Sequence, residues 1–394
     1  MTPTATSEQR SGGVRTQLPG LLSLALASCL AVTTEMLPVG LLPGISQSFR
    51  VADSVTGLLV SLYALVVAAL AVPLTLATAR FARKPLLLTT VLCYALSNTL
   101  VAIAPTFAVL AAGRVVGGVT HALFFSLCIG YVPRLVTGTH VGRALAIATG
   151  GATAGFIVGV PLSTSLGTAL GWRTSFGVLA VLSVLTLALV AKALPPVAND
   201  AQVRPTQSRS GRAELAAVVS SNSVTYLGQF TLYTFVSLLF LAAGARPAFI
   251  GPLLLLCGVC GLVGLAYAAS TLDGNPRRTT VVTLTIVIAA VLALGIGMPM
   301  LVPVVLAAAV WNGAFGGVPS IYQACAVRSH AVSPELAGAW VNASANFGIA
   351  GGAAIGAGLL PLIGVGGLPW VGAALIGAGL AIGLGARRAF PTRP

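Results

Sequence analysis

The chain has 394 residues, of which 57% are hydrophobic and 7% charged, and its mean hydropathy is +0.99. No soluble domain of this length hides so much apolar surface in one core, so the composition excludes a soluble globular protein and indicates a membrane protein. The formal net charge of +14 would suit nucleic acid. The placement of the basic residues, described below, gives that charge another meaning.

Twelve apolar segments follow one another along the chain, and crossing the hydrocarbon core as a helix takes about 20 such residues. The segments cover residues 18–44, 55–76, 86–104, 107–132, 144–166, 176–194, 215–241, 250–270, 280–298, 301–326, 337–363 and 368–384. We therefore predict an all-α integral membrane protein with twelve transmembrane helices in two six-helix, pseudo-symmetric halves.

Polar segments set the domain boundaries. We expect a disordered cytoplasmic tail over 1–17, a first half over 18–194, a cytoplasmic linker over 195–214, a second half over 215–386 and a tail over 387–394. Features of the first half recur in the second: Gly117-Gly118-Val119 corresponds to Gly316-Gly317-Val318, and spans five and eleven are both rich in glycine. Such repeats predict halves related by an axis along the membrane normal, with a substrate site at their interface.

The basic residues gather on one side of the predicted membrane. Seventeen of the 21 fall in the tails, the linker or loops of one side, namely Arg10, Arg15, Arg80, Arg83, Lys84, Arg134, Arg143, Lys192, Arg204, Arg209, Arg212, Arg277, Arg278, Arg328, Arg387, Arg388 and Arg393. Arg50, Arg173 and Arg246 fall on the other side, and Arg114 lies inside a span. By the positive-inside rule both termini are cytoplasmic, the first span is retained, and the protein is multi-pass in the plasma membrane. The positive charge is thus a topology signal, and we expect the lipid bilayer and no nucleic acid as a partner.

Glu35 is the single acidic residue that the predicted spans enclose. An ionised side chain inside a membrane costs several kcal/mol unless it faces a partner or water, so it indicates a functional site, with proton coupling as its leading role. The alternative is a carboxyl group retained for packing alone.

Polar residues of the second half are neutral and recur at helical spacing. Asn222, Tyr226, Gln229 and Tyr233 share one face of span seven, Trp311 and Asn312 lie in span ten, and Asn342 and Asn346 share a face of span eleven. We predict that they line a substrate cavity that offers stacking surfaces and hydrogen bonds. Hydrogen bonding between helices is the alternative.

Four stretches carry a resemblance to a known family. They are Thr34-Glu-Met-Leu-Pro-Val-Gly-Leu-Leu-Pro43, Thr78-Ala-Arg-Phe-Ala-Arg-Lys84, Arg114-Val-Val-Gly-Gly-Val-Thr-His-Ala-Leu-Phe-Phe125, and Gly155-Phe-Ile-Val-Gly-Val-Pro161 with Gly171-Trp-Arg173. Together they resemble the major facilitator superfamily in its twelve-span drug:proton antiporter branch, close to arabinose-efflux-permease-like and chloramphenicol-resistance-like exporters. The resemblance implies a proton-coupled exporter of small organic molecules, working by alternating access.

The resemblance also gives roles to particular residues. In the implied fold spans one and four are neighbours, and Glu35 and Arg114 both lie roughly 10 to 14 Å below the outer surface at 1.5 Å per residue. We therefore predict Glu35 as the proton-binding group, Arg114 as its electrostatic partner and His121, two turns deeper, as a polar group or relay. The alternatives are a static packing anchor for Arg114 and a satisfied backbone contact for His121.

Two further motifs have roles that the resemblance implies. Gly151, Gly155 and Gly159 with Pro161 form the antiporter-motif helix, whose tight packing would seal the cavity against proton leak, although packing alone explains such glycines equally well. Arg80, Arg83 and Lys84 stand in the gating loop, which departs from the family pattern at Thr75, Ala79 and Ala82. Because Ala79 replaces the usual Asp, that loop lacks the usual conformation-dependent ion pair.

Other classes fit less well. An enzyme would need a nucleophile and base or a metal site, and three histidines with one membrane-embedded acid supply no ligand set. A channel would show a repeated filter or charged ring, and a non-transporting receptor or scaffold leaves Glu35 and Arg114 unexplained. We expect a monomer with no cofactor that uses the proton gradient, transporting protons and a small molecule. Aromatic residues favour drugs or natural products such as antibiotics, whereas the amide-rich second half favours sugars or nucleosides.

Overall fold

The computed structural model describes residues 16–78, 80–136, 141–197, 209–332 and 334–392, and within these residues every regular element is a helix. The first half contains α1 (Leu18–Phe49), α2 (Asp53–Ala77), α3 (Arg83–Ala102), α4 (Phe107–Tyr131), η1 (Val132–Arg134), α5 (Val141–Ala154), η3 (Gly155–Gly159), α6 (Val160–Leu170) and α7 (Trp172–Ala193). The second half contains α8 (Arg209–Tyr233), α9 (Val236–Ala242), η4 (Pro247–Phe249), α10 (Ile250–Thr271), α11 (Pro276–Gly297), α12 (Leu301–Phe315), α13 (Val318–Arg328) and α14 (Pro334–Gly385).

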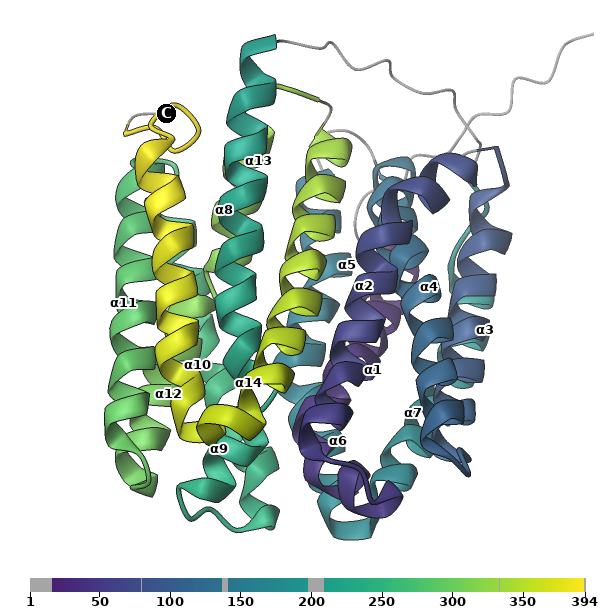
Figure 1. Ribbon diagram of the computed structural model, residues 1–394. Coiled ribbons are helices and arrows are strands. Elements are labelled where there is room, and N and C mark those ends of the chain that lie inside the picture. Colours follow the sequence, from purple (N-terminus) through teal and green to yellow (C-terminus); the bar gives the residue numbers. More distant parts are fainter. Residues whose placement is uncertain (1–15, 79, 137–140, 198–208, 333, 393–394) are drawn as a thin grey trace, which may run out of the picture.

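These helices supply the twelve predicted spans. Among the described residues, ten helices are long and apolar enough to cross a membrane, and the bent pair α8 and α9 brings the number to eleven. One of the ten, Leu336–Gly385, is a pair of arms that meet at Gly364, where the backbone is not helical, so the total is twelve. Figure 1 shows the two arms of α14 as a V. The all-α, twelve-helix prediction is confirmed.

Helix boundaries differ from the predicted ones where polar residues continue a helix. α1 runs to Phe49, five residues beyond the predicted end of span one at residue 44. α8 begins at Arg209, so the last residues of the predicted linker, 209–214, are helical. Residues 198–208 of the linker and 1–15 of the N-terminal tail lie outside the described residues.

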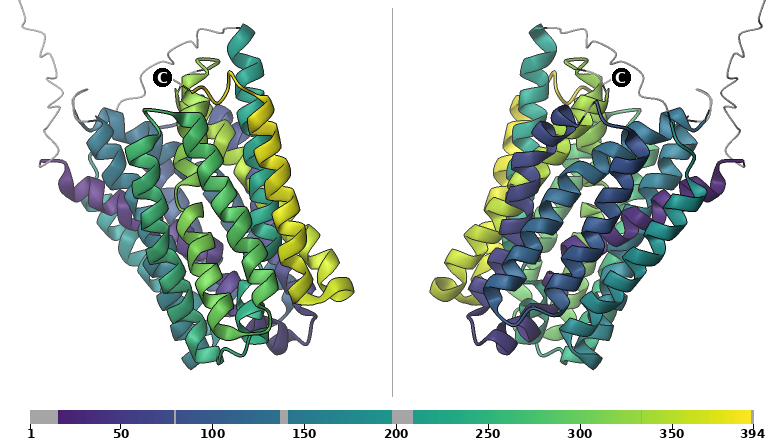
Figure 2. Two further views of the ribbon diagram at one scale, coloured as in Figure 1. Left: turned by 90° about the vertical axis from the view of Figure 1, so that its left-hand side faces the viewer. Right: turned by 90° about the vertical axis from the view of Figure 1, so that its right-hand side faces the viewer.

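Both ends of the described chain lie at one end of the helix bundle, which we call the linker end. The first turn of α1 lies against the last turn of α7, since a Cβ on Gly20 would be 3.2 Å from the carbonyl oxygen of Ala193. At the same end the backbone N–H of Arg277 donates to the carbonyl of Pro391, 3.0 Å away. Figure 2 shows the helices running lengthwise between this end and the opposite one, the far end.

The two halves pack tightly together toward the far end. α10 packs on α6 and η3, where a Cβ on Gly251 would lie 2.8 Å from the carbonyl oxygen of Pro161. α2 runs beside α14 and approaches the start of α9 closely, because Gly57 leaves room for the Phe235 ring. In Figure 1, α2 and the first arm of α14 lie side by side at the centre of the molecule.

Span ten is divided into α12 and α13 at Gly316 and Gly317, and two further spans contain breaks. In span five the helix widens into the π-helical turn η3, two residues before Pro161, which has no N–H to donate to the preceding turn. In span seven α8 and α9 meet at an angle of 42° around Thr234 and Phe235. Both breaks lie where the halves meet, so they shape the interface that the site occupies.

Candidate functional site

The site begins with a proline that leaves a backbone acceptor without its helical donor. In an α-helix the N–H of residue 38 would donate to the carbonyl of residue 34, but Pro38 of α1 has no N–H. Arg114 of α4 supplies the missing hydrogen bond, because its Nη1 donates to the Thr34 carbonyl at 2.6 Å. Its Nη2 donates to the Glu35 carbonyl at 2.7 Å. The buried guanidinium therefore ties α4 to the middle of α1.

The Glu35 carboxylate contacts a histidine. Glu35 Oε2 lies 3.7 Å from His121 Nε2, within ion-pair range but beyond a hydrogen bond. The other ring nitrogen, Nδ1, is 3.1 Å from the hydroxyl of Tyr63 on α2. All three side chains are buried. They form a continuous polar chain, Glu35–His121–Tyr63, across α1, α4 and α2.

Tyr63 also joins this chain to Arg114. The guanidinium carbon of Arg114 lies 4.1 Å from the centre of the Tyr63 ring, in cation–π geometry. The ring reaches this position because Gly117 has no side chain: a Cβ there would lie 2.8 Å from Tyr63 Cε2. The glycine and the two polar residues of the Arg114-x-x-Gly117-x-x-x-His121 pattern thus occupy one face of α4.

Glu35 and Arg114 lie close together, as predicted, but the contact between them is not the one expected from the sequence. Arg114 reaches Glu35 through the main-chain carbonyl. Within the described residues, the basic side chain within 4 Å of the Glu35 carboxylate is that of His121. The geometry therefore gives Arg114 the packing role that was its alternative, and its part in proton coupling stays a prediction. Tyr63 was missed because a tyrosine in an apolar span has no sequence spacing that marks it.

The second half contributes a neutral aromatic cluster. It consists of Tyr226, Phe230 and Tyr233 of α8 with Trp311 and Phe315 of α12, and its neighbouring ring centres lie 5.4 to 6.2 Å apart. The indole N–H of Trp311 donates to Gln229 Oε1 at 2.6 Å. Phe156 of η3 stacks on Tyr233 with ring centres 5.5 Å apart, so the cluster extends across the interface between the halves.

The amides of the predicted cavity lining make contacts within the second half. Asn222 is fully buried and donates to the Val341 carbonyl and the Ser344 hydroxyl of α14. Asn312 donates to the carbonyl one turn back in α12, and Asn346 donates to both oxygens of Asn342. In this conformation Asn222 and Asn312 have the interhelical or local role that was the alternative. Tyr226, Gln229, Tyr233 and Trp311 are brought together as a cluster.

The glycines of span five are in close contact with α1. A Cβ on Gly151 would lie 1.8 Å from the Ala25 carbonyl oxygen, one on Gly155 2.4 Å from that of Cys29, and one on Gly159 2.1 Å from Thr33 Oγ1. Only glycine permits this approach. Pro161 follows two residues after Gly159, and its carbonyl faces Gly251 of α10. The predicted sealing role itself stays a prediction.

The predicted gating loop lies at the linker end. Lys84 Nζ donates to the Ala191 carbonyl at 2.8 Å, Arg83 is partly buried, and the Arg80 guanidinium lies over the Phe81 ring. Ala79 lies outside the described residues. Thr75, at the position of the family's glycine, donates to the Ser126 hydroxyl at 2.8 Å and so links α2 to α4. In the second half, Asp273 of the loop after α10 forms an ion pair with Arg328 at the end of α13, 2.7 Å away.

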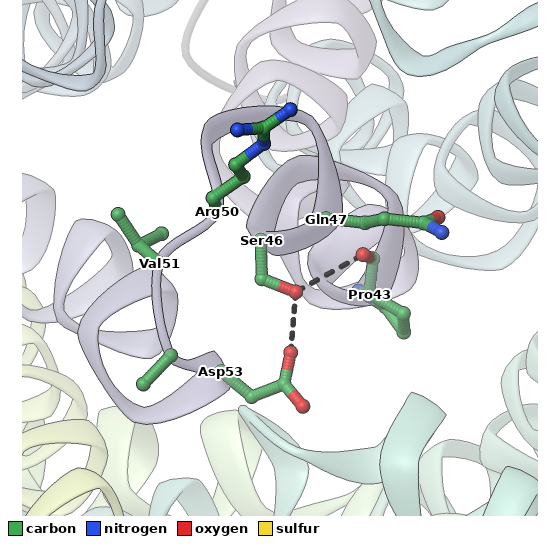
Figure 3. Close-up of a pocket in the computed structure, with 7 residues that line it drawn as sticks. Pro43, Ser46, Gln47, Arg50, Val51 and Asp53 are labelled. Carbon is green, nitrogen blue, oxygen red and sulfur yellow. Dashed lines mark hydrogen bonds between the residues drawn. The ribbon is translucent and has the colours of Figure 1, made fainter.

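A shallow depression lies at the far end, between α1 and α2 (Figure 3). Its lining consists of Pro43, Ser46, Gln47, Arg50, Val51, Ala52 and Asp53. The Ser46 hydroxyl hydrogen-bonds the Pro43 carbonyl and the Asp53 carboxylate. These groups satisfy one another and close the connection between two helices, so we do not assign the substrate site to them. The described residues contain no group of three or more His, Cys, Asp or Glu side chains suited to a metal ion.

The family model of the Major Facilitator Superfamily matches residues 24–338. The chain belongs to this superfamily. A chloramphenicol efflux pump of Mycobacterium tuberculosis is 33% identical over 370 residues, covering 90% of this chain and 89% of the pump. A protein of Mannheimia succiniciproducens named "Probable sugar efflux transporter" is 28% identical over 363 residues, with 90% of each chain covered.

Solved structures show the same fold. A bacterial homolog of the human lysosomal transporter Spinster, in an inward-facing and unoccupied conformation, gives a TM-score of 0.76 at 14% identity, with 96% of this chain and 98% of that chain covered. A D-xylose–proton symporter gives a TM-score of 0.75 at 15% identity, with the same coverage. The protein is thus a membrane transporter of the Major Facilitator Superfamily, and not an enzyme.

Proposed function

We propose that the protein exports small organic molecules in exchange for protons, by alternating access between its two halves. The observation that carries this proposal is the buried contact of the Glu35 carboxylate of α1 with His121 of α4. A carboxyl group in that position is costly when ionised and is relieved when it binds a proton. Glu35 is therefore the proton-binding group of the proposed cycle.

Features of the second half support a proposal for the substrate class. Five aromatic rings and the Gln229–Trp311 hydrogen bond offer stacking and one oriented amide but no charge. Such a surface suits a neutral or weakly cationic molecule with an aromatic ring. The relative named as a chloramphenicol efflux pump supports drugs or natural products as substrates. Sugar efflux is the second candidate, which the other relative's name supports.

We also propose where the protein is located, how it is oriented in the membrane and what drives transport. The excess of basic residues on one side favours a multi-pass plasma-membrane protein with both termini in the cytoplasm. On this proposal the linker end faces the cytoplasm. The protein would work as a monomer in the bilayer, would take its energy from the proton gradient, and would need no cofactor.

The test is transport by purified protein in proteoliposomes, with radiolabelled chloramphenicol and a panel of sugars as probes. Two rates are measured for wild type and Glu35→Gln: uptake driven by a pH gradient, and exchange of substrate at equal pH on both sides. Glu214→Gln is the matched control, because Glu214 is a partly exposed carboxyl group near the start of α8. We expect Glu35→Gln to lose gradient-driven uptake and keep exchange, while the control keeps both.

Each other result would change the proposal. Equal gradient-driven rates in wild type and Glu35→Gln would remove Glu35 from the coupling step. Wild-type transport that ignores the pH gradient would make the protein an uncoupled carrier. Transport of sugars alone would favour the second candidate substrate class.

A further inference from the structure

We propose that Tyr63 is a positioning residue of the proton site: its hydroxyl selects the tautomer of His121 that faces Glu35, while its ring holds the Arg114 guanidinium against the backbone of α1. The inference rests on the proposed function, in which Glu35 binds the proton. It adds a residue on α2 to a site otherwise built by α1 and α4.

Each ring nitrogen of His121 has one partner, and the protonation of one nitrogen determines whether the other donates or accepts. Nε2 faces the Glu35 carboxylate at 3.7 Å, and Nδ1 faces the Tyr63 hydroxyl at 3.1 Å. When Glu35 is ionised it can only accept, so Nε2 carries the proton and Nδ1 accepts from the hydroxyl. When Glu35 is protonated it can donate to Nε2, and Nδ1–H then donates to the hydroxyl oxygen. A phenol hydroxyl can take either part, but it donates more strongly than it accepts, so it favours the tautomer with the proton on Nε2, facing Glu35.

The aromatic ring of Tyr63 has a separate effect. It lies 4.1 Å from the guanidinium carbon of Arg114, whose Nη atoms are occupied by the carbonyls of Thr34 and Glu35. Tyr63 therefore lies between the Arg114 guanidinium and the His121 imidazole. In this position its ring favours hydrogen bonds from Arg114 to the main-chain carbonyls of α1 over an ion pair with the Glu35 carboxylate. We infer that this separation leaves the Glu35 carboxylate accessible to a proton.

Other polar groups face this chain and must be considered in any pH experiment. Tyr94 of α3 meets the His121 ring edge-on with ring centres 6.5 Å apart, and Arg114 lies on the same helix as His121. From the second half, Tyr226 of α8 is within electrostatic reach of Glu35. Of these residues, Tyr63 is the one whose hydroxyl is hydrogen-bonded to the imidazole.

The test uses ¹⁵N-histidine NMR of the full-length protein, because ring-nitrogen shifts distinguish the two tautomers. The chain has three histidines, so His140→Gln and His330→Gln leave His121 as the single label. In this background we compare Tyr63 with Tyr63→Phe, which keeps the ring and removes the hydroxyl. Tyr322→Phe is the control, since it removes a buried hydroxyl that bonds Ser221 and Thr225 in the other half.

We expect Tyr63→Phe to change the His121 tautomer ratio by about fivefold, the factor that one ordinary hydrogen bond supplies. It should also shift the pH at which the tautomer changes and, with it, the pH profile of gradient-driven transport. Gly117→Ala should act in the same direction, because its Cβ displaces the Tyr63 ring. Identical tautomer ratios and pH dependence in wild type and Tyr63→Phe would overturn the inference, even if Glu35→Gln behaves as proposed. A change in Tyr322→Phe as large as in Tyr63→Phe would also overturn it.

Discussion

The two halves of the transporter share a glycine-based helix-packing motif and differ in the side chains that the motif brings together. In the first half, three glycines spaced by four residues on span five pack against α1. In the second half, Gly348, Gly352 and Gly356 of α14 pack in the same way against α8, where their added Cβ atoms would lie 2.4 to 2.6 Å from the carbonyl oxygens of Ser223, Leu227 and Thr231. The scaffold thus repeats almost residue by residue, which supports the predicted correspondence of spans five and eleven.

The chemistry on that scaffold does not repeat. The first half buries an acid, a guanidinium and an imidazole within one cluster, whereas the corresponding region of the second half holds aromatic rings joined by one amide. A repeated fold therefore specifies where helices approach one another, and substitutions on it specify which half carries charge. The difference supports a division of labour, with proton binding in the first half and substrate binding in the second.

The largest effect is expected from breaking the anchor of the charged cluster. Arg114→Met leaves the Thr34 carbonyl without a donor, and we expect a loss of roughly 3 kcal/mol in unfolding free energy. Pro38→Ala restores the helical N–H to that carbonyl, so it should recover about 1 to 2 kcal/mol in the Arg114→Met background. Thermal unfolding in detergent of the four proteins of this double-mutant cycle measures the coupling. Additive effects would show that Arg114 does not compensate for Pro38.

The second prediction tests whether the glycine-based helix-packing motif contributes equally to the stability of both halves. Gly155→Ala and Gly352→Ala each place a Cβ 2.4 Å from a carbonyl oxygen, and each should cost about 2 kcal/mol because the helices must separate. Gly150→Ala and Gly358→Ala are matched controls, since no atom of another helix lies within 4 Å of their added Cβ atoms. The same unfolding measurement compares them. A cost in one half alone would contradict the equivalence.

Much of this comparison could be predicted from the sequence. Span length and hydropathy determine the twelve helices, and the spacing of Gly151, Gly155 and Gly159 determines which face of span five approaches a neighbour. Glu35, Arg114 and His121 are recognisable because ionisable groups inside a membrane are costly. These features are local, so one sequence suffices to identify them.

The partners of these groups could not be predicted, because they depend on helix rotation and on atoms from other spans. Pro38 indicates from sequence that the Thr34 carbonyl, four residues earlier, lacks its helical donor. The sequence does not indicate that Arg114 would supply that hydrogen bond. Asn222 has helical spacing like that of Tyr226, yet it turns toward α14. Hydrophobic periodicity cannot distinguish a helix face that lines an interface within one half from a face that lines a cavity.

The third prediction tests whether the aromatic cluster of the second half affects substrate affinity without affecting the pH dependence of transport. Trp311→Phe keeps an aromatic ring and removes the N–H that orients Gln229, so KM should rise about fivefold, the worth of one hydrogen bond. The pH profile should not move, because neither residue titrates. Substrate dependence of exchange at several pH values measures both quantities. A shift of the pH profile comparable to that of Tyr63→Phe would contradict the division of labour between the halves.

The smallest effect is expected at the linker end, where the second half retains an ion pair in its loop. Arg328 contacts Asp273 at 2.7 Å, but the Asp273 side chain is 94% exposed. Because exposed pairs contribute little, Asp273→Asn should lower the unfolding free energy by less than about 1 kcal/mol. The pair joins the loop after α10 to the end of α13, two elements of one half, so its loss should leave gradient-driven transport within about twofold of wild type. Transport and thermal unfolding of Asp273→Asn measure the two effects, and a large loss of transport without a loss of stability would make this loop a gate rather than a surface contact.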